Sequence, residues 1–219
     1  VWYGLSLGSV LLLAAIGLAI AFGVMGVINM ANGEMVMIGA YTTGLLAYHL
    51  EVAPWLGIPA AILVAAVIGM TLGRIVMRLR GPYLALTTLS FAEIMRLVIG
   101  NSYDFTRGDL GLNVPGLFDS RIGWYYLFLA VVAVVQLALY ALLKSRAGLY
   151  LQAIRDDEVA ASSRGVDVVF WKTAAFTIST AISGLAGALY GHFSQLVSPE
   201  LGLVLQTGLV ICMVFIGGI

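Results

Sequence analysis

The chain is 219 residues long, and 61% of its residues are hydrophobic while only 10% are charged. Eleven basic and eleven acidic side chains balance to a formal net charge of zero, which gives no support to a nucleic-acid partner. The mean hydropathy is +1.03, and apolar windows of about 20 residues recur along the chain. This composition excludes an ordinary water-soluble domain and predicts an all-α, polytopic transmembrane helix bundle.

The apolar windows predict seven or more membrane spans. In chain order they are 5–27, 35–50, 56–77, 83–99, 123–143, 173–192 and 204 to the end of the chain. The second is short for a spanning helix, so we expect it to be tilted, broken or only partly spanning. The chain starts without methionine and stops within an apolar run. We therefore expect residues 1–219 to be a single transmembrane domain that is truncated at both ends.

Basic residues predict the orientation of these spans. Eight of the eleven lie on one side, namely Arg74, Arg78, Arg80, Lys144, Arg146, Arg155, Arg164 and Lys172. Arg107 and Arg121 lie in the segment 100–122 on the other side. The positive-inside rule then places 144–172 in the cytoplasm and 100–122 outside. Because the chain changes sides of the membrane at each span, residue 1 is expected outside and the polar segment 29–34 towards the cytoplasm, unless that segment re-enters the membrane.

A polar island at 155–165 interrupts the apolar sequence and is typical of a short helix. Its markers are Asp156 as the expected N-cap, Asp157 and Glu158 in the first turn, Arg164 in the last turn and Gly165 in the left-handed position that follows. Its small residues Ala160, Ala161 and Ser163 suit close contact with another protein. We therefore expect a cytoplasmic docking helix within a loop of about 144–172.

Several kinds of chemistry are missing from the sequence. It contains no GxxxxGK[ST], HExxH or GxSxG motif, so neither a P-loop ATP site nor an enzyme is expected. Cys212 is the single cysteine, which rules out a disulfide or a multi-cysteine metal site within the chain. His49 and His192 lie near outer ends of predicted spans and are expected to be interfacial polar residues. We expect no metal and no cofactor to bind this chain.

Polar side chains within the predicted spans are the candidates for a substrate path. Glu93 and Arg96 are three residues apart and can pair on one helix face, either as a structural pair or near the path. Glu34 is expected to cap the second helix or to line a polar cavity. We expect both carboxylates to face polar surroundings within the bundle. The candidate path residues are Asn29, Asn32, Glu34, Thr87, Thr88 and Glu93.

Hydroxyl side chains and rows of small residues are two further features of the predicted spans. The hydroxyls of Thr87, Thr88 and Ser90 either bond back to the preceding helical turn or line a path. Small residues at four-residue spacing predict close approach between helices. These rows are Ser179–Ser183–Gly187–Gly191, Gly69–Gly73 and Gly4–Gly8.

Three segments of the sequence carry motifs of a known family. Residues 23–41 are similar to the pattern GVINxAxGxxxxxGAY. Residues 80–94 contain RGPYLALTTL and FAEI, and residues 153–190 begin with AIR and include GLAGALY. Together these segments resemble the permease subunits of ABC importers for branched-chain amino acids, and the resemblance covers nearly the whole chain. Such importers contain two related permeases. The last two segments look more like the one with the GPYFAL and AIRxxExAA motifs, whereas the first segment looks somewhat more like the other permease.

The resemblance implies that the chain belongs to a transporter of several subunits at a prokaryotic plasma (inner) membrane. A second permease subunit completes the pathway, an external solute-binding protein delivers the substrate, and two cytoplasmic ATPase subunits use ATP and drive transport through a coupling helix. The coupling role carries over to Val159, Ala160, Ala161 and Gly165, which align with the importer pattern EAA---G. Val159 stands where the glutamate belongs and Glu158 precedes it, while Arg155 and Asp157 are expected contacts at the edge.

Three alternatives remain open from the sequence. A permease for urea or short-chain amides shares the INMAxGE region closely. An ion-coupled secondary transporter is disfavoured by the single carboxylate pair and by the well-formed polar helix. A purely structural membrane scaffold would not need Asn29, Asn32, Glu34 and Glu93 in its spans.

Overall fold

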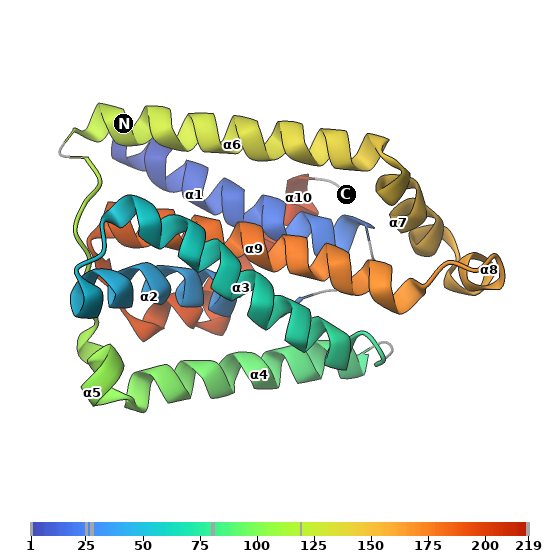
Figure 1. The fold of residues 1–219 in the computed structure, drawn as a ribbon, viewed down its shortest axis with the longest axis horizontal. Helices are drawn as coiled ribbons and strands as arrows, with labels where there is room; N and C mark the ends of the chain where they lie inside the picture. Colours follow the sequence, from blue (N-terminus) through green and yellow to red (C-terminus); the bar gives the residue numbers. More distant parts are fainter. Residues whose placement is uncertain (1, 25, 27–28, 80–81, 119, 218–219) are drawn as a thin grey trace.

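The structure of the chain, a computed structural model, describes residues 2–24, 26, 29–79, 82–118 and 120–217. Most of this part is helical (Figure 1). The long helices are α1 (Trp2–Ala19), α2 (Asn32–Leu50), α3 (Pro54–Val76), α4 (Pro82–Asn101), α6 (Arg121–Lys144), α9 (Val168–Ser194) and α10 (Val204–Gly217). The shorter elements are the π-helical η1 (Ile20–Val24), α5 (Tyr103–Thr106), η2 (Gly108–Leu110), β1 (Leu112–Asn113), α7 (Arg146–Asp156), α8 (Glu158–Ser163), β2 (Leu196–Val197) and η3 (Pro199–Gly202).

The predicted spans correspond to helices. Within the described residues, five helices are long and apolar enough to cross a membrane, and these are α1 with most of η1, α3, α4, α6 and α9. The second predicted span is α2, which has 19 residues and is therefore longer than expected. The seventh is α10, with 14 residues in the described part. The described residues thus form an all-α, polytopic membrane bundle in which five helices are long enough to span and α2 and α10 are further apolar helices.

Local sequence signals fix where several helices begin. Pro54 is the first residue of α3, a position where its missing N–H costs nothing. The Ser120 side chain caps α6 by accepting a hydrogen bond from the Gly123 N–H at 3.0 Å. Asp167 caps α9 in the same way, accepting from the Phe170 N–H at 3.0 Å.

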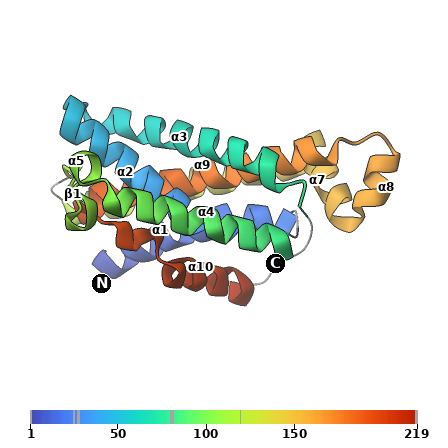
Figure 2. The same ribbon diagram turned by 90° about the horizontal axis from the view of Figure 1, so that it is seen from below.

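Helix α9 is the centre of the bundle. It packs against α1, α2 and α3, while α6 lies outside α1 and α4 forms the opposite edge (Figures 1 and 2). The predicted row of small residues on α9 faces α1 and α2, whereas the predicted Gly69 of α3 meets α9 at Thr180, outside that row. A Cβ added to Gly187 would collide with the backbone of Val36 on α2, and one added to Gly69 of α3 would collide with Thr180. The Gly4–Gly8 pair contacts nothing within 4 Å of an added Cβ, so the contact predicted there is wrong for this chain.

The two polar loops lie at opposite ends of the bundle, as the parity of the spans predicted. Helices α7 and α8 extend from one end, and α5 with the β1 strand lies at the other (Figures 1 and 2). At that second end β1 pairs antiparallel with β2, and Leu112 lies opposite Val197. The assignment of the α7–α8 end to the cytoplasm stays a prediction from the charges.

Candidate functional site

The chain breaks its helical path between α1 and α2. The last turn of α1 widens into the π-helical η1, and Gly26 has a φ of +63°, a conformation that favours glycine. The Asn29 Oδ1 then accepts a hydrogen bond from the Ala31 N–H at 3.0 Å. The Met30 N–H donates to the Thr88 Oγ1 of α4 at 3.3 Å. These bonds fix the break against α4.

Helix α2 starts inside the bundle. Asn32 is completely buried, and its side chain bridges two other helices. Its Nδ2 donates to the Ala14 carbonyl of α1 at 3.4 Å, and its Oδ1 accepts from the Ser183 Oγ of α9 at 2.7 Å. Of the two positions expected for 29–34, the structure therefore has the re-entrant one and not the simple position at the cytoplasmic end. The segment re-enters the bundle because its amides find partners on α1 and α9.

Glu34 lies buried beside this bridge with only 1% of its surface exposed. Its Oε2 has no hydrogen-bond partner among the described residues, and the same holds for the Asn29 Nδ2 and the Thr207 Oγ1. A Cβ on Gly202 of η3 would lie 3.4 Å from the Glu34 Oε1, so η3 packs directly against this carboxyl group. We call the group of Asn29, Asn32, Glu34, Thr88, Ser183 and Thr207 the break cluster.

The structure divides the predicted path residues into two groups. Asn29, Asn32, Glu34 and Thr88 belong to the break cluster. Thr87 is partly exposed and its hydroxyl donates to the Tyr83 carbonyl at 2.8 Å, so it lies outside the cluster, and its place on a substrate path stays a prediction. Thr88 and Ser90 also bond back to their own helix, as one of the two readings had it. Adjacent threonines thus serve opposite faces of α4.

Glu93 lies on the outer side of α4. It forms the expected pair with Arg96, whose Nε donates to the Glu93 Oε2 at 3.1 Å. The Glu93 side chain remains 45% exposed and that of Arg96 27%. The expectation that Glu93 lies within the bundle formed by this chain is therefore wrong, because α4 is an edge helix and, within the described residues, no element packs against its outer face.

The polar island forms α8, with a different N-cap from the one expected. Asp157, and not Asp156, caps the helix, and its Oδ1 accepts from the N–H groups of Val159 and Ala160 at 2.8 and 3.0 Å. Asp156 instead ends α7. Helix α7 extends to Asp156, further than the charge pattern suggested, so the N-cap of α8 is one residue later than expected.

The C-terminal end of α8 matches the sequence prediction. Gly165 has a φ of +84°. Its N–H bonds to the Ser162 carbonyl at 2.9 Å, while the Val166 N–H bonds to the Ala161 carbonyl at 3.2 Å. This is the paired pattern of a Schellman motif, which closes a short helix firmly.

The two sides of α8 differ in exposure. Glu158 pairs with Lys172 at the start of α9, and Lys172 is buried. Ala161 is only 6% exposed, so its predicted place on an open docking surface is wrong because α8 folds back towards α9. The open side carries Val159, which is 71% exposed, together with Ala160. Arg155 at the edge is also exposed.

His192 differs from its expected role. It is completely buried, and its Nδ1 lies 2.8 Å from the Pro115 carbonyl. A carbonyl only accepts, so the Nδ1 carries the proton and the Nε2 is left without a partner among the described residues. His49 is exposed near the Phe105 carbonyl, as expected of an interfacial residue. No sequence signal distinguishes these two histidines.

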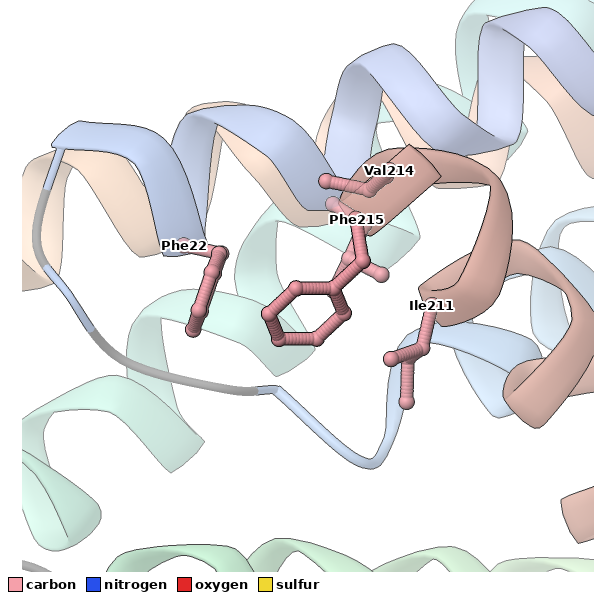
Figure 3. A pocket seen from close by; sticks show the side chains of 5 residues that line it. Phe22, Ile211, Val214 and Phe215 are labelled. Carbon is pink, nitrogen blue, oxygen red and sulfur yellow. The ribbon is translucent and has the colours of Figure 1, made fainter. Parts of the chain in front are cut away.

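One hollow in the surface lies beside the break but is entirely apolar. It lies between the end of α1 and α10 and is too narrow to hold a water molecule (Figure 3). Leu18, Phe22, Ile211, Val214 and Phe215 line it, and the Phe22 and Phe215 rings lie 4.9 Å apart. It offers no polar group to a charged solute. Within the described residues, no three His, Cys, Asp or Glu side chains gather as a metal site would require.

Comparisons with known proteins agree on one family. The family model described as "Branched-chain amino acid transport system / permease component" matches residues 1–219. The chain is 34% identical to LivM of Salmonella typhimurium and 33% identical to LivM of Escherichia coli, over 94% and 97% of its length. It is 28% identical to LivH of Escherichia coli over 91% of its length.

The relatives are transport permease proteins by name. The alignments cover 56% and 57% of the two LivM relatives and 72% of LivH, so the chain spans little more than half the length of LivM. No solved structure matches it significantly. Because the family model matches the whole chain, the chain belongs to the permease component family of branched-chain amino acid transport systems.

Proposed function

We propose that this chain is a transmembrane permease subunit of an ATP-driven importer of branched-chain amino acids in a prokaryotic inner membrane. In this proposal ATP is used by two cytoplasmic ATPase subunits, and the chain itself binds no cofactor. An external solute-binding protein delivers the amino acid, and a second permease completes the pathway. The higher identity to LivM than to LivH supports the LivM-like position within the pair.

One observation carries this proposal: α8 and the break cluster are linked by a single continuous helix. Glu158 joins α8 to Lys172 near the start of α9. Eleven residues further along the same helix, Ser183 binds Asn32 at the break. Helix α9 has 27 residues, which corresponds to about 40 Å at 1.5 Å per residue. A displacement of α8 by an ATPase would therefore reach the break through a rigid element.

The break cluster has the chemistry that a zwitterionic substrate needs. Buried polar groups without partners are costly in a membrane protein and are expected where a solute passes. Glu34 offers a carboxylate oxygen for an ammonium group, and the Asn29 Nδ2 offers a donor for a carboxylate. The start of α2 adds the positive end of a helix dipole within the bundle. In this proposal the substrate passes beside these groups during alternating access.

The experiment is ATP-dependent uptake of radiolabelled leucine by proteoliposomes that contain the complete importer with its binding protein. The variant Ala160→Trp adds bulk to the open side of α8 and should leave the permease inserted. We expect it to abolish leucine uptake and to weaken co-purification of the ATPase, since an overpacked contact costs about 1–3 kcal/mol.

The control is Ala130→Trp, at an exposed position on the outer face of α6 far from α8. It should transport normally. Normal uptake by Ala160→Trp with the ATPase still bound would overturn the coupling role of α8. Uptake of urea or acetamide, with none of leucine, would overturn the substrate.

A further inference from the structure

The corner between α6 and α7 joins an apolar surface to a cationic one. Helix α6 carries no acidic or basic residue between Arg121 and Lys144, and its exposed side chains include Val134 and Leu137. The outer face of α6 therefore suits contact with lipid acyl chains. Lys144 and Arg146 are the first charged residues after this apolar stretch, so they lie where the lipid headgroups begin.

The turn at Ser145 fixes the positions of these two basic residues. Ser145 follows α6 and also caps α7, where its Oγ accepts a hydrogen bond from the Gly148 N–H at 3.4 Å. A Cβ on Gly148 would collide with the Leu143 carbonyl, so the two helices meet closely. Beyond the turn the chain leaves the direction of α6, and α7 runs towards α8 (Figure 1). Lys144 and Arg146 are both exposed, and neither forms an ion pair within the described residues.

Helix α7 is apolar on two faces, and the chain covers one of them. Leu151 is buried on the covered face, where α7 packs against α6 and α9. The open face begins at Arg146 and continues at three-, four- and seven-residue spacing with the exposed side chains of Leu149, Tyr150 and Ala153. A helix whose open face combines apolar side chains with a cation is typical of one that lies in a membrane interface.

Aromatic rings surround the same corner. The Lys144 Nζ lies 4.4 Å from the centroid of the Tyr140 ring, one turn earlier on α6. Tyr150 stacks on Trp171 of α9 with the ring centroids 5.1 Å apart, and the adjacent Phe170 is exposed. Tyrosine and tryptophan are enriched at membrane–water interfaces because each has an apolar body and a polar group. The rings therefore indicate that the corner lies at the boundary between acyl chains and headgroups.

The charge of the corner favours an anionic occupant. No acidic residue occurs between Arg121 and Asp156. Asp156 is ten residues from Arg146, which corresponds to about 15 Å along α7 at 1.5 Å per residue. Glu158, further along the chain, is already paired with Lys172. Anionic lipids of the cytoplasmic leaflet attract basic residues that lie close to the membrane surface.

We propose that the α6–α7 corner is a binding surface for anionic phospholipids. Their phosphate groups contact Lys144 and Arg146, and their acyl chains lie along Leu149 and the outer face of α6. This surface goes beyond the proposed function, and its occupant is independent of the solute that is transported. Bound lipid holds α7 at the membrane surface and thereby sets the depth of α8, which follows α7 directly in the chain.

The first test is native mass spectrometry of the full-length protein with the subunits that co-purify, in detergent with equimolar phosphatidylglycerol and phosphatidylcholine. We expect the most tightly bound lipid to be phosphatidylglycerol. The double variant Lys144→Gln with Arg146→Gln should retain at least fivefold less of it, because both cations are lost. No preference for phosphatidylglycerol in the unmodified protein would overturn the proposal.

Two controls separate the corner from the overall charge and from the fold. The charge-preserving double variant Lys144→Arg with Arg146→Lys should retain phosphatidylglycerol like the unmodified protein. Arg107→Gln removes a cation beside the Tyr48 ring at the opposite end of the bundle and should also retain it. A loss in either control as large as in the glutamine double variant would contradict a lipid surface at this corner.

Photo-crosslinking in liposomes of mixed phosphatidylcholine and phosphatidylglycerol identifies the occupant directly. A photoreactive phenylalanine analogue replaces Leu149 in one preparation and Ser162, which is exposed on α8, in the other. We expect lipid adducts at Leu149 and none at Ser162. Adducts of Leu149 with another protein subunit and none with lipid would show that α7 is a protein interface, and the lipid surface would be rejected.

Discussion

Ser183 and Asn32 are 151 residues apart in the sequence and joined by a buried hydrogen bond of 2.7 Å. The bond connects the middle of α9 to the first residue of α2. Because Asn32 also donates to Ala14 of α1, one amide holds three helices together at the point where the chain re-enters the bundle. The position of the break therefore depends on α9.

The first prediction concerns this bond. Ser183→Ala leaves the Asn32 Oδ1 without its donor and should lower the free energy of unfolding by about 1 kcal/mol. The measurement is reversible unfolding in mixed micelles. Ser9→Ala is the matched control, because the Ser9 hydroxyl is exposed and bonds only to the Leu5 carbonyl of its own helix. Equal stability of the two variants would show that the Asn32 bridge is dispensable.

The second prediction concerns the close contact between α2 and α9. Gly187→Ala places a methyl group against the backbone of Val36, which cannot move aside without shifting α2. We expect a loss of about 1–3 kcal/mol in stability or a failure to fold. Gly8→Ala should be neutral or slightly stabilising, since its Cβ meets open space within a helix. Thermal unfolding in detergent compares the two, and similar transition temperatures would contradict the packing described for α9.

The third prediction separates two neighbouring aspartates. Asp157→Ala removes the cap of α8 and should destabilise that helix by about 1 kcal/mol, which is roughly a fivefold rise in the exchange rate of its amide protons. Asp156→Ala should change exchange little, because Asp156 does not accept from α8. Hydrogen exchange followed by mass spectrometry resolves this segment. Faster exchange in Asp156→Ala than in Asp157→Ala would restore the cap expected from the sequence.

The fourth prediction concerns the ion pair between α8 and α9. Lys172→Glu places two carboxylates together and should reduce transport strongly while the ATPase still binds, because the open side of α8 is unchanged. The double variant Glu158→Lys with Lys172→Glu restores opposite charges and should recover part of the activity. The measurement is leucine uptake together with ATPase co-purification. No recovery in the double variant would mean that Lys172 acts through another contact.

The helices could be predicted from the sequence because apolar length and end signals are local properties. Residues 56–77 became α3 (Pro54–Val76), and Gly165 took the left-handed position that its place after a short helix suggested. In contrast, Thr87 and Thr88 have the same chemistry and adjacent positions, and only the rotation of α4 decides which one meets Met30.

The site depended on tertiary contacts that no local pattern encodes. Ala161 looked suited to docking, but the fold of α8 against α9 buries it. Glu93 pairs with Arg96 at the three-residue spacing expected on a helix. It nevertheless lies outside the bundle, because its surroundings depend on what covers α4. His192 is buried by a loop about 77 residues away in the sequence, whose approach the sequence did not reveal.

The attachment of the β1 loop to α9 has a thermodynamic consequence. The His192 Nδ1 bonds to the Pro115 carbonyl, β1 pairs with β2, and the Val114 N–H donates to the Gln195 carbonyl at 3.0 Å. All three contacts lie at the end of α9 that is remote from Lys172. The loop at one end and α8 at the other are therefore both attached to α9. In the importer that we propose, linkage then requires that any factor by which the binding protein changes the affinity of α8 for the ATPase is matched by an equal factor in the reverse direction.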